Sequence, residues 1–178
     1  MKLNLGCGAD VREGWTNVDW IFPKGQPGDV VHWNLDDTPL PFPSDSVDEI
    51  YCSHILEHLW EWENLVLDCH RMLKPGGLLT IRVPYGFYPV SGHKRFFIPQ
   101  TLDYYLAGGT MRKGVTGFEE STNDKRVDFK LISRTIVRRL PFQWHIRKYL
   151  RWNVPHDFPI GFKWEIRWDL QKPSLWRD

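Results

Sequence analysis

The chain has 178 residues, of which 42% are hydrophobic, 25% are charged and 15% are aromatic, and its formal net charge is +1. This length suits one globular domain over residues 1–178 with a single sizeable core, and the composition is ordinary for a soluble protein. No apolar run approaches about 18 residues, and the N-terminus lacks a basic region followed by an apolar segment. These absences argue against a membrane span and a signal peptide, so a cytoplasmic protein is predicted.

The cysteines and the distribution of charge restrict the class further. Cys7, Cys52 and Cys69 are odd in number and lack C-x-x-C spacing, so neither a disulfide framework nor a zinc knuckle is predicted. Residues 1–123 carry 10 Lys and Arg against 16 Asp and Glu, whereas residues 124–178 carry 13 against 6. The resulting net charges of −6 and +7 indicate that the C-terminal part faces an anionic partner or the acidic part of the chain.

Two glycines follow the first predicted strand. The short apolar run at residues 2–5 leads into Gly6-Cys7-Gly8, and a second short strand ends at Asp19. Glycines let backbone amides approach a ligand closely, and an acidic residue after the next strand accepts ribose hydroxyl hydrogens in dinucleotide-binding folds. The pattern predicts a nucleotide-cofactor cradle, and its structural alternative is a turn that only closes a loop.

The spacing in this region argues against a dinucleotide. The dinucleotide fingerprint has a third glycine and an acidic residue about 20 residues further on. Here Val11 occupies the third position, and only ten residues lie between Gly8 and Asp19. Because a full crossover helix barely fits in that space, we expect a shortened or missing helix and a cofactor without a pyrophosphate.

Strands and helices alternate through the first half of the chain. Further strands are predicted at residues 17–20, 30–34, 47–53 and 78–83, and residues 61–73 have apolar positions at helical spacing. The run LLTIRV within them is apolar almost throughout, which is typical of a central parallel strand buried on both faces between helices. We therefore predict an α/β fold with a doubly wound, mostly parallel sheet.

The second half is less regular. A short helix is predicted at residues 99–107, a loop at 110–126, and an antiparallel strand pair at the sheet edge from 127–139 and 161–170. Within a single domain, residues 1–109 would form the cofactor-binding core, and the remainder would supply a loop, a basic aromatic segment and edge strands.

Four motifs in the first half resemble the class I S-adenosylmethionine-dependent methyltransferases, specifically their type 11 branch. They are LNLGCG at 3–8, GWTNVD at 14–19, NLDDTPLPFPSDSVDEIYCSHILEHL at 34–59 and LKPGGLLTIRVP at 73–84, with a looser likeness in HKRFFIPQTLDYYL at 93–106. The resemblance implies a seven-stranded methyltransferase sheet and S-adenosylmethionine as cofactor. Unlike many relatives, the chain starts directly at the first strand, without the N-terminal helices that cover the substrate. An open site, or one completed by the basic tail or another subunit, is therefore expected.

The same resemblance assigns cofactor-binding residues. They are Leu5, Gly6, Cys7, Gly8, Asp19, Trp20, Asn34, Leu35, Asp36, Ser53 and His54. The methionine part would lie over the glycine turn, the ribose at Asp19 and the adenine against Trp20. Relatives often have Asp where this chain has Asn34, so the adenine-edge contact stays open between Asn34 and the two residues after it. Ser53 and His54 would end the fourth strand beside the transferable methyl group.

Three histidines are candidate catalytic residues. Methyl transfer from a sulfonium is an in-line displacement that needs alignment, exclusion of water, and a base if the acceptor must lose a proton. His54, His58 and His93 can take a proton near neutral pH. His93 is the first choice because it follows the fifth strand on a loop, where such sheets present substrate groups. For each histidine, a hydrogen bond to backbone without catalysis is the alternative.

Residues His54 to His58 also match the H-x-x-E-H spacing of inverzincin metalloproteases. Two histidines four residues apart on a helix share a face and can bind zinc. This motif, however, immediately follows a strand, lies in the methyltransferase-like block and has no evident third ligand. No metal site is predicted.

Residues 134–152 interleave Arg and Lys with aromatic residues and Leu. Such composition suits an anionic membrane surface, a phosphate-bearing substrate or RNA, and the alternative is an edge strand and loop with a solvated basic face. A homo-oligomer is a further interpretation. Pro141 prevents one uninterrupted amphipathic helix.

The leading functional prediction is methyl transfer from S-adenosylmethionine to an oxygen or nitrogen of a small-molecule or glycan acceptor. A sugar or glycan-pathway intermediate is suggested by analogy with type 11 relatives. The alternatives are a non-catalytic cofactor-binding accessory protein and a membrane- or RNA-binding module that uses residues 134–152.

Overall fold

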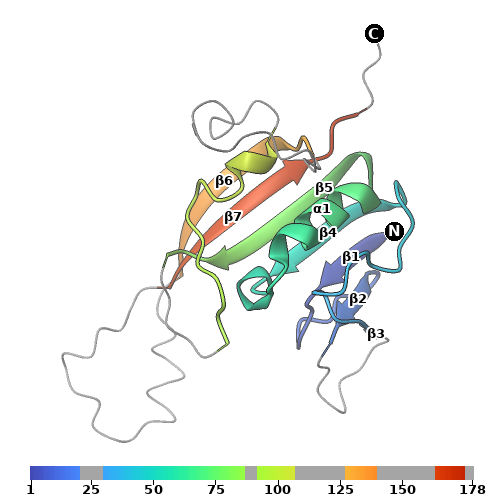
Figure 1. The fold of residues 1–178 in the computed structure, drawn as a ribbon, viewed down its shortest axis with the longest axis horizontal. Helices are drawn as coiled ribbons and strands as arrows, with labels where there is room; N and C mark the ends of the chain where they lie inside the picture. Colours follow the sequence, from blue (N-terminus) through green and yellow to red (C-terminus); the bar gives the residue numbers. More distant parts are fainter. Residues whose placement is uncertain (21–29, 87–91, 107–126, 140–162, 175–178) are drawn as a thin grey trace, which may run out of the picture.

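The computed structural model describes residues 1–20, 30–86, 92–106, 127–139 and 163–174, which contain a seven-stranded sheet in the order β3-β2-β1-β4-β5-β7-β6 (Figure 1). Its strands are β1 (Lys2–Leu5), β2 (Thr16–Asp19), β3 (Val30–His32), β4 (Val47–Ser53), β5 (Leu73–Pro84), β6 (Lys130–Arg139) and β7 (Lys163–Gln171). The first five strands are parallel, and β7 runs antiparallel to both β5 and β6. The predicted mostly parallel sheet with a C-terminal antiparallel pair is confirmed.

The described helical elements are α1 (Trp62–Met72) and two 3₁₀ turns, η1 (Leu56–His58) and η2 (Asp103–Tyr105). The helix predicted at 61–73 is therefore confirmed, whereas the one predicted at 99–107 is a single 3₁₀ turn. Its backbone amides donate to carbonyls three residues back, in the hydrogen bonds from Tyr105 to Leu102 and from Leu106 to Asp103. None of the described helices is long and apolar enough to cross a membrane.

Strand β5 begins earlier than the sequence predicted, at Leu73 instead of residue 78. Leu73 pairs with Val47 of β4, and Gly76 and Gly77 exchange backbone hydrogen bonds with Lys172 beyond the end of β7. The Lys-Pro-Gly-Gly run does end α1, but its backbone groups find partners on both sides and continue as strand. The predicted loop at 110–126 and residues 140–152 of the basic segment lie outside the described residues.

The connection from β1 to β2 contains no helix, as its length predicted. Side-chain hydrogen bonds of Asn17 hold this connection in place of helical backbone bonds. Its Oδ1 accepts from the backbone N–H of Arg12 (2.9 Å) and from Asn4 Nδ2 (2.9 Å). Its Nδ2 donates to the Arg12 carbonyl (3.0 Å). Asn4 and Asn17 are both buried, so these bonds satisfy polar groups that would otherwise be costly inside the protein.

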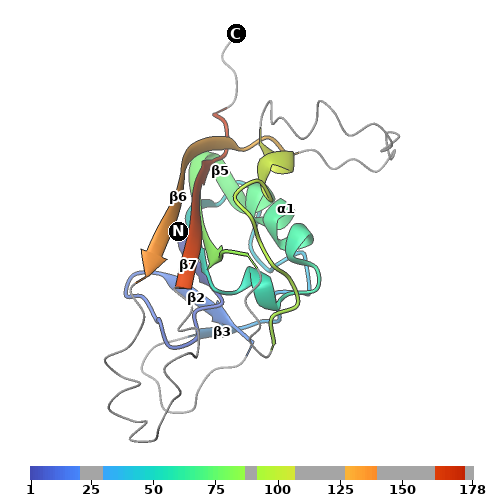
Figure 2. The same cartoon turned by 90° about the vertical axis from the view of Figure 1, so that its left-hand side faces the viewer.

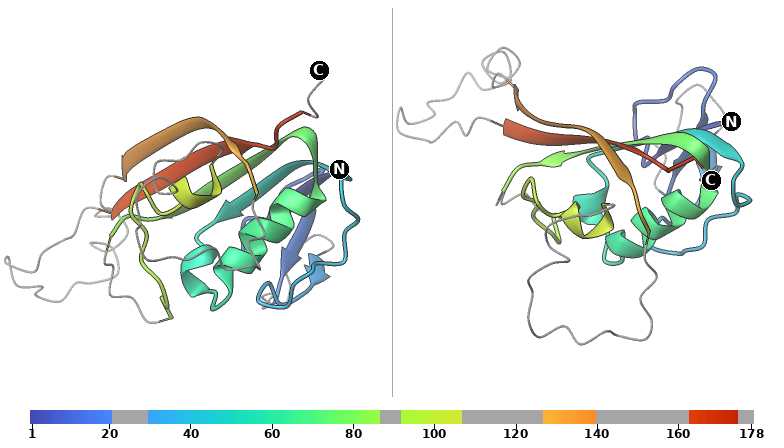
Figure 3. Two further views of the ribbon diagram at one scale, coloured as in Figure 1. Left: turned by 45° about the horizontal axis from the view of Figure 1, so that its top comes forward. Right: turned by 90° about the horizontal axis from the view of Figure 1, so that it is seen from above.

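One face of the sheet carries the hydrophobic core. Side chains that alternate along the strands, such as Leu3, Ile50 and Leu79, are fully buried on this face, together with Trp168 of β7. Figures 2 and 3 show α1 and both 3₁₀ turns on this same side of the sheet. The apolar stripe of α1 that packs in the core consists of Leu65, Val66, Cys69 and Met72.

The opposite face is polar, and among the described residues no helix covers it (Figure 2). The expectation that LLTIRV is buried on both faces is wrong for these residues: Leu78 is 42% exposed, and Thr80 and Arg82 are half-buried. On this face Thr80 donates to Asp169 Oδ1 (2.8 Å) and Arg82 pairs with Glu165 (2.5 Å). Strand β7 thus supplies polar partners where a doubly wound sheet would place an apolar helix.

Candidate cofactor and active site

Two pockets open near the carboxyl ends of the parallel strands, the edge at which open α/β sheets bind ligands. The first has a volume of about 430 Å³ and is lined by Asn4, Gly6, Cys7, Gly8, Ala9, Asp10, Arg12, Tyr51, Ser53, His54 and Arg82. The second has a volume of about 370 Å³ and is lined by Asp19, Trp20, Asn34, Leu35, Asp36, Ile55, His58, Leu59 and Lys94. Both volumes fall in the range of about 300 to 1,000 Å³ usual for ligand sites.

The glycine turn separates the two pockets. Gly6 has φ of +68°, and a Cβ at this position would lie 2.5 Å from Cγ1 of Ile55, which lines the second pocket. Only glycine therefore fits without moving Ile55. Gly8 (φ +48°) has no atom within 4 Å of a Cβ position, and its N–H donates to Asp19 Oδ2 at 2.7 Å. The turn and the acid at the end of β2 are thus held together, with open space over Gly8.

The second pocket is lined by the aromatic ring of Trp20 and by the carboxylate of Asp36. The Trp20 ring is 54% exposed and lies with its centroid 5.0 Å from that of His32 on β3. Asp36 Oδ1 accepts from the backbone N–H groups of Trp60 (2.8 Å) and Glu61 (3.0 Å). The Asp36 carboxylate therefore fixes the loop ahead of α1, whereas Trp20 presents an aromatic face toward solvent.

The first pocket is strongly polar. The Arg12 guanidinium lies 3.5 Å from the centroid of the Tyr51 ring and pairs with Asp10 at 3.1 Å. Although burial raises the pKa of Tyr51, its hydrogen bonds with Ser53 and Arg82 and the positive charges of Arg82 and Arg12 lower that pKa overall. Burial and the neighbouring Asp19 carboxylate raise the pKa of Cys7 to about 11, so this thiol is uncharged at neutral pH.

His54 lies between two buried carboxylates. The chain leaves β4 at this residue with φ of +55°, a left-handed conformation that is uncommon for a side chain other than glycine. Its Nδ1 faces Glu57 Oε1 at 3.3 Å, and its Nε2 faces Glu165 Oε1 at 2.9 Å. The hydrogen bond to Glu57, with further contributions from the Glu165 charge, raises the pKa of His54 against the effect of burial. Both contacts are satisfied together only when both ring nitrogens carry protons.

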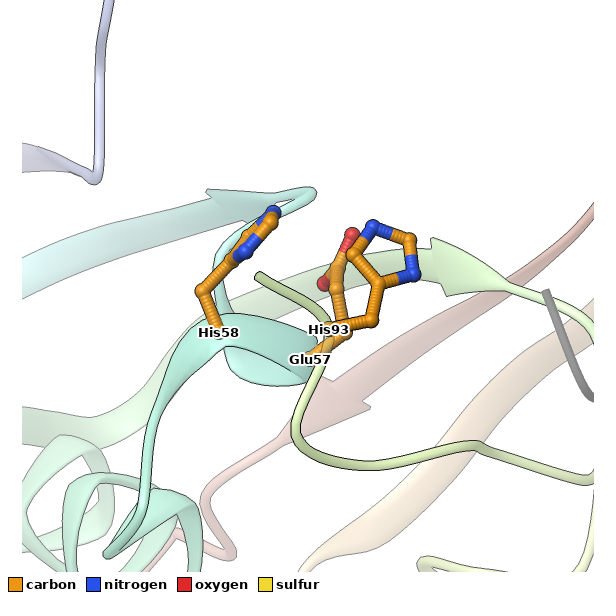
Figure 4. A group of neighbouring side chains, drawn as sticks. All are labelled: Glu57, His58 and His93. Atoms are coloured by element: carbon orange, nitrogen blue, oxygen red, sulfur yellow. The ribbon is translucent and has the colours of Figure 1, made fainter. Parts of the chain in front are cut away.

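Glu57, His58 and His93 form a second cluster, drawn in Figure 4. The His58 and His93 rings meet edge to face with centroids 4.8 Å apart, and the Glu57 carboxylate lies beside them. His58 Nδ1 donates to the Gly92 carbonyl at 3.0 Å, and the Glu57 carbonyl accepts from the N–H of Lys94 at 2.7 Å. These backbone contacts hold the loop that carries His93 against η1.

The structure brings most predicted site residues to one edge of the sheet. Gly6, Cys7, Gly8, Ser53 and His54 line the first pocket, and Asp19, Trp20, Asn34, Leu35, Asp36 and His58 line the second. Leu5 is fully buried and lines neither, and His93 touches the second pocket's His58 without lining it.

Several residues of the site were missed by sequence reasoning. Arg12, Tyr51 and Arg82 line the first pocket, Lys94 lines the second, and Glu165 reaches the site from β7. The available signal was the alternation of polar residues in β5 and β7, because Thr80 and Arg82 in one and Glu165 and Asp169 in the other mark a polar sheet face.

Comparison with known proteins agrees with this geometry. Residues 18–81 match a family model described as a methyltransferase domain. A Mycolicibacterium smegmatis protein named "Probable S-adenosylmethionine-dependent methyltransferase" is 39% identical over 46% of this chain and 37% of that protein. The ubiquinone/menaquinone biosynthesis C-methyltransferase UbiE of Saccharophagus degradans is 35% identical over 41% of this chain and 30% of that protein. The chain thus spans less than half the length of these curated relatives.

Solved structures share the fold across nearly the whole chain. The cyclase SpnF matches with a TM-score of 0.63 and 15% identity, over 97% of this chain and 75% of its own. The 1,6-didemethyltoxoflavin-N1-methyltransferase of Burkholderia thailandensis, solved with S-adenosylhomocysteine, matches with a TM-score of 0.57 and 14% identity, over 97% and 71%. At these identities the likeness concerns the fold alone, which is the Rossmann-like methyltransferase fold.

The sequence matches are more specific than this likeness in fold. Together with the sheet order, the match at residues 18–81 and the named relatives show that this part of the chain is similar to S-adenosylmethionine-dependent methyltransferases.

Proposed function

We propose that the protein transfers a methyl group from S-adenosylmethionine to an oxygen or nitrogen of a small acceptor. The observation that carries the proposal is the pair of pockets that meet at Gly6 and Ile55, with Asp19 bonded to the Gly8 amide between them. A sugar or glycan-pathway acceptor is the proposed subclass and rests on the resemblance to type 11 methyltransferases.

The residues present fit this cofactor. Trp20 offers an exposed ring for an adenine to stack on, and Asp19 offers a carboxylate for ribose hydroxyls. Arg12 and Asp10 in the first pocket offer opposite charges that suit the carboxylate and the ammonium of a methionine group. The open space over Gly8 allows a ligand to approach the backbone at the junction. When bound, the cofactor supplies a methyl group on a sulfonium, which is transferred by in-line displacement.

The histidines would then have separate roles. His54, with both ring nitrogens bound to carboxylates and a raised pKa, is a poor proton acceptor and acts as a positioning residue at the end of β4. His93 stays the first choice for a general base, with His58 beside it, because the loop after β5 lies where such sheets present substrate groups. Tyr51 and Arg82 would orient polar groups of the acceptor in the first pocket.

Transfer of labelled methyl groups to an acceptor panel tests the proposal, with sugars, amines and carbon nucleophiles included. Asp19→Ala should raise the KM for the cofactor by about 10- to 100-fold with little change in kcat, because it removes one charged hydrogen-bond acceptor. Glu13→Ala is the matched control, since Glu13 is an exposed acid of the same crossover that lines neither pocket. Cofactor binding without transfer to any acceptor would favour the accessory-protein alternative, and equal KM values in both variants would contradict the role of Asp19.

A further inference from the structure

We propose that Glu57, His58 and His93 bind a divalent transition-metal ion, with Zn²⁺ the ion that fits their chemistry best. One potential ligand atom from each of the three side chains lies within 4.8 Å of the other two. Figure 4 shows both imidazoles beside the Glu57 carboxylate, two residues from η1 and one from the loop after β5. The H-x-x-E-H spacing pointed to His54 as a ligand, but the fold turns His54 to Glu165 and supplies His93 as the third group.

The Glu57 carboxylate has an oxygen available to bind a cation. Glu57 is 1% exposed; its Oε1 bonds to His54, and its Oε2 is buried with no hydrogen-bond partner. An unpartnered buried acceptor destabilises the folded state, and more so when it is charged, so such atoms are rare in folded proteins. A cation held between this oxygen and the two imidazoles would satisfy it.

The imidazoles are also arranged as ligands. Because His58 Nδ1 donates to the Gly92 carbonyl, the neutral ring has its Nε2 unprotonated and able to bind a metal. Metal-binding histidines usually have their other ring nitrogen fixed by such a carbonyl or carboxylate. The Glu57 carbonyl accepts from the N–H groups of Lys94 (2.7 Å) and Arg95 (3.3 Å), which fixes the backbone beside His93.

The spacing requires a small adjustment on binding. Bonds of about 2.1 Å place the ligand atoms of a tetrahedral ion about 3.4 Å apart, so the side chains would rotate inward by about 1 Å. Two nitrogens and one carboxylate suit Zn²⁺ or a neighbouring first-row ion, whereas Mg²⁺ and Ca²⁺ prefer oxygen ligands alone. Three protein ligands leave an open coordination position, as in catalytic zinc sites.

The cluster adjoins both pockets. His58 lines the second pocket, and Glu57 bonds to His54, which lines the first. A hydroxyl oxygen of the acceptor would occupy the open position. The ion would then lower the pKa of that hydroxyl, so that loss of its proton would not require a histidine base. This catalytic role rests on the proposed function, whereas binding of the ion does not.

Metal binding can be measured on the full chain without cofactor or acceptor, so its failure is distinguishable from failure of the proposed function. Chelator-treated protein is titrated with Zn²⁺ by calorimetry, and one ion per chain is expected. The double variant His58→Ala/His93→Ala should weaken binding at least about 100-fold, and Glu57→Gln about tenfold or more. His32→Ala removes an exposed histidine outside the cluster and should leave the affinity unchanged.

Cobalt spectroscopy identifies the ligand directly. In His93→Cys, bound Co²⁺ should give thiolate-to-cobalt charge-transfer absorption, whereas His32→Cys, with a thiol outside the cluster, should not. The three native cysteines are buried, which keeps the background low. Absence of stoichiometric Zn²⁺ binding, full affinity in the double variant, or no charge-transfer band in His93→Cys would each overturn the proposal.

Discussion

The two faces of the sheet differ in what they contribute. The face under α1 buries apolar side chains completely, among them Leu79, Ile81 and Trp168, whose indole N–H donates to the Pro99 carbonyl. The opposite face pairs charged and polar side chains with one another, as in Arg82 with Glu165 and Thr80 with Asp169. Burial of apolar area is the larger source of stability, whereas a paired polar face mainly orients groups.

The covered face of the sheet therefore mainly stabilises the fold, and the polar face mainly positions side chains of the candidate site. The polar chain that begins at Tyr51 and Arg82 continues through Glu165 to His54 and ends at the carboxylate of Glu57. Tyr51, Arg82 and Glu165 alternate with core residues on their strands, and Glu57 directly follows the buried Leu56. The covered face therefore holds the strands in register, and the polar face uses that register to place the site.

The largest effect is expected on the covered face. Trp168→Ala should lower the free energy of unfolding by about 3 to 5 kcal/mol, because it leaves a cavity in place of a fully buried ring. Urea unfolding monitored by circular dichroism measures the change. Ile132→Ala on β6, where the side chain is 51% exposed, is the control and should change stability by less than about 0.5 kcal/mol. Similar losses in the two variants would contradict the assignment of the core.

The two glycines of the glycine turn should differ in the same way. Substitution of Gly6 should mainly reduce stability, whereas substitution of Gly8 should mainly weaken ligand binding. Gly6→Ala should cost about 2 to 4 kcal/mol, from the left-handed backbone and from the contact with Ile55. Gly8→Ala meets no atom within 4 Å and should cost only about 1 to 2 kcal/mol, yet it should weaken S-adenosylhomocysteine binding if the ligand lies over this amide. Unfolding curves and calorimetry on both variants measure the split, and intact binding in Gly8→Ala would argue against that approach.

On the polar face the expected loss is smaller. Glu165→Gln keeps the size of the side chain but leaves Arg82 and His54 without its charge, so we expect about 1 to 3 kcal/mol less stability. The pKa of His54 should also fall, which NMR titration of its ring protons would detect. Lys74→Gln removes an exposed ion pair with Asp48 and should leave the urea midpoint nearly unchanged. An unchanged His54 titration would show that Glu165 does not set its charge.

The smallest effects concern two histidines that respond to pH in opposite directions. Burial against Phe129 and the nearby Lys172 lower the pKa of His70 to about 4, so the unfolded chain binds its proton first and stability falls as pH drops from about 6.5 toward 4. The raised pKa of His54 gives stability that is present below about 6.5 and is lost as pH rises through the folded value.

Substitution should separate the two contributions. Urea midpoints between pH 4 and 8 should become less sensitive to acid in His70→Gln and less sensitive to rising pH in His54→Gln. Identical profiles in the two variants would contradict the opposite settings of these residues.

Local pattern was enough to predict β1, β4, α1 and the glycine turn, because each depends on neighbouring residues. It could not predict that Glu165 binds His54, since a chain separation of 111 residues is closed only by the position of β7 beside β5. The burial of LLTIRV was overestimated for a related reason, since Thr80 and Arg82 find polar partners on β7. Likewise, the meeting of His93 with His58 depends on backbone contacts of Gly92 and Lys94 that leave no periodic signal in the sequence.

The most direct test of the central claim is thermal unfolding of the full chain with and without S-adenosylhomocysteine. At about 100 times its dissociation constant, the ligand should add about 2.7 kcal/mol and raise Tm by roughly 5 to 11 °C for a chain of this size. Asp19→Ala should lose most of that rise at the same ligand concentration. No shift in the unsubstituted protein, with no heat of binding in calorimetry, would contradict the assignment of the two pockets to this cofactor.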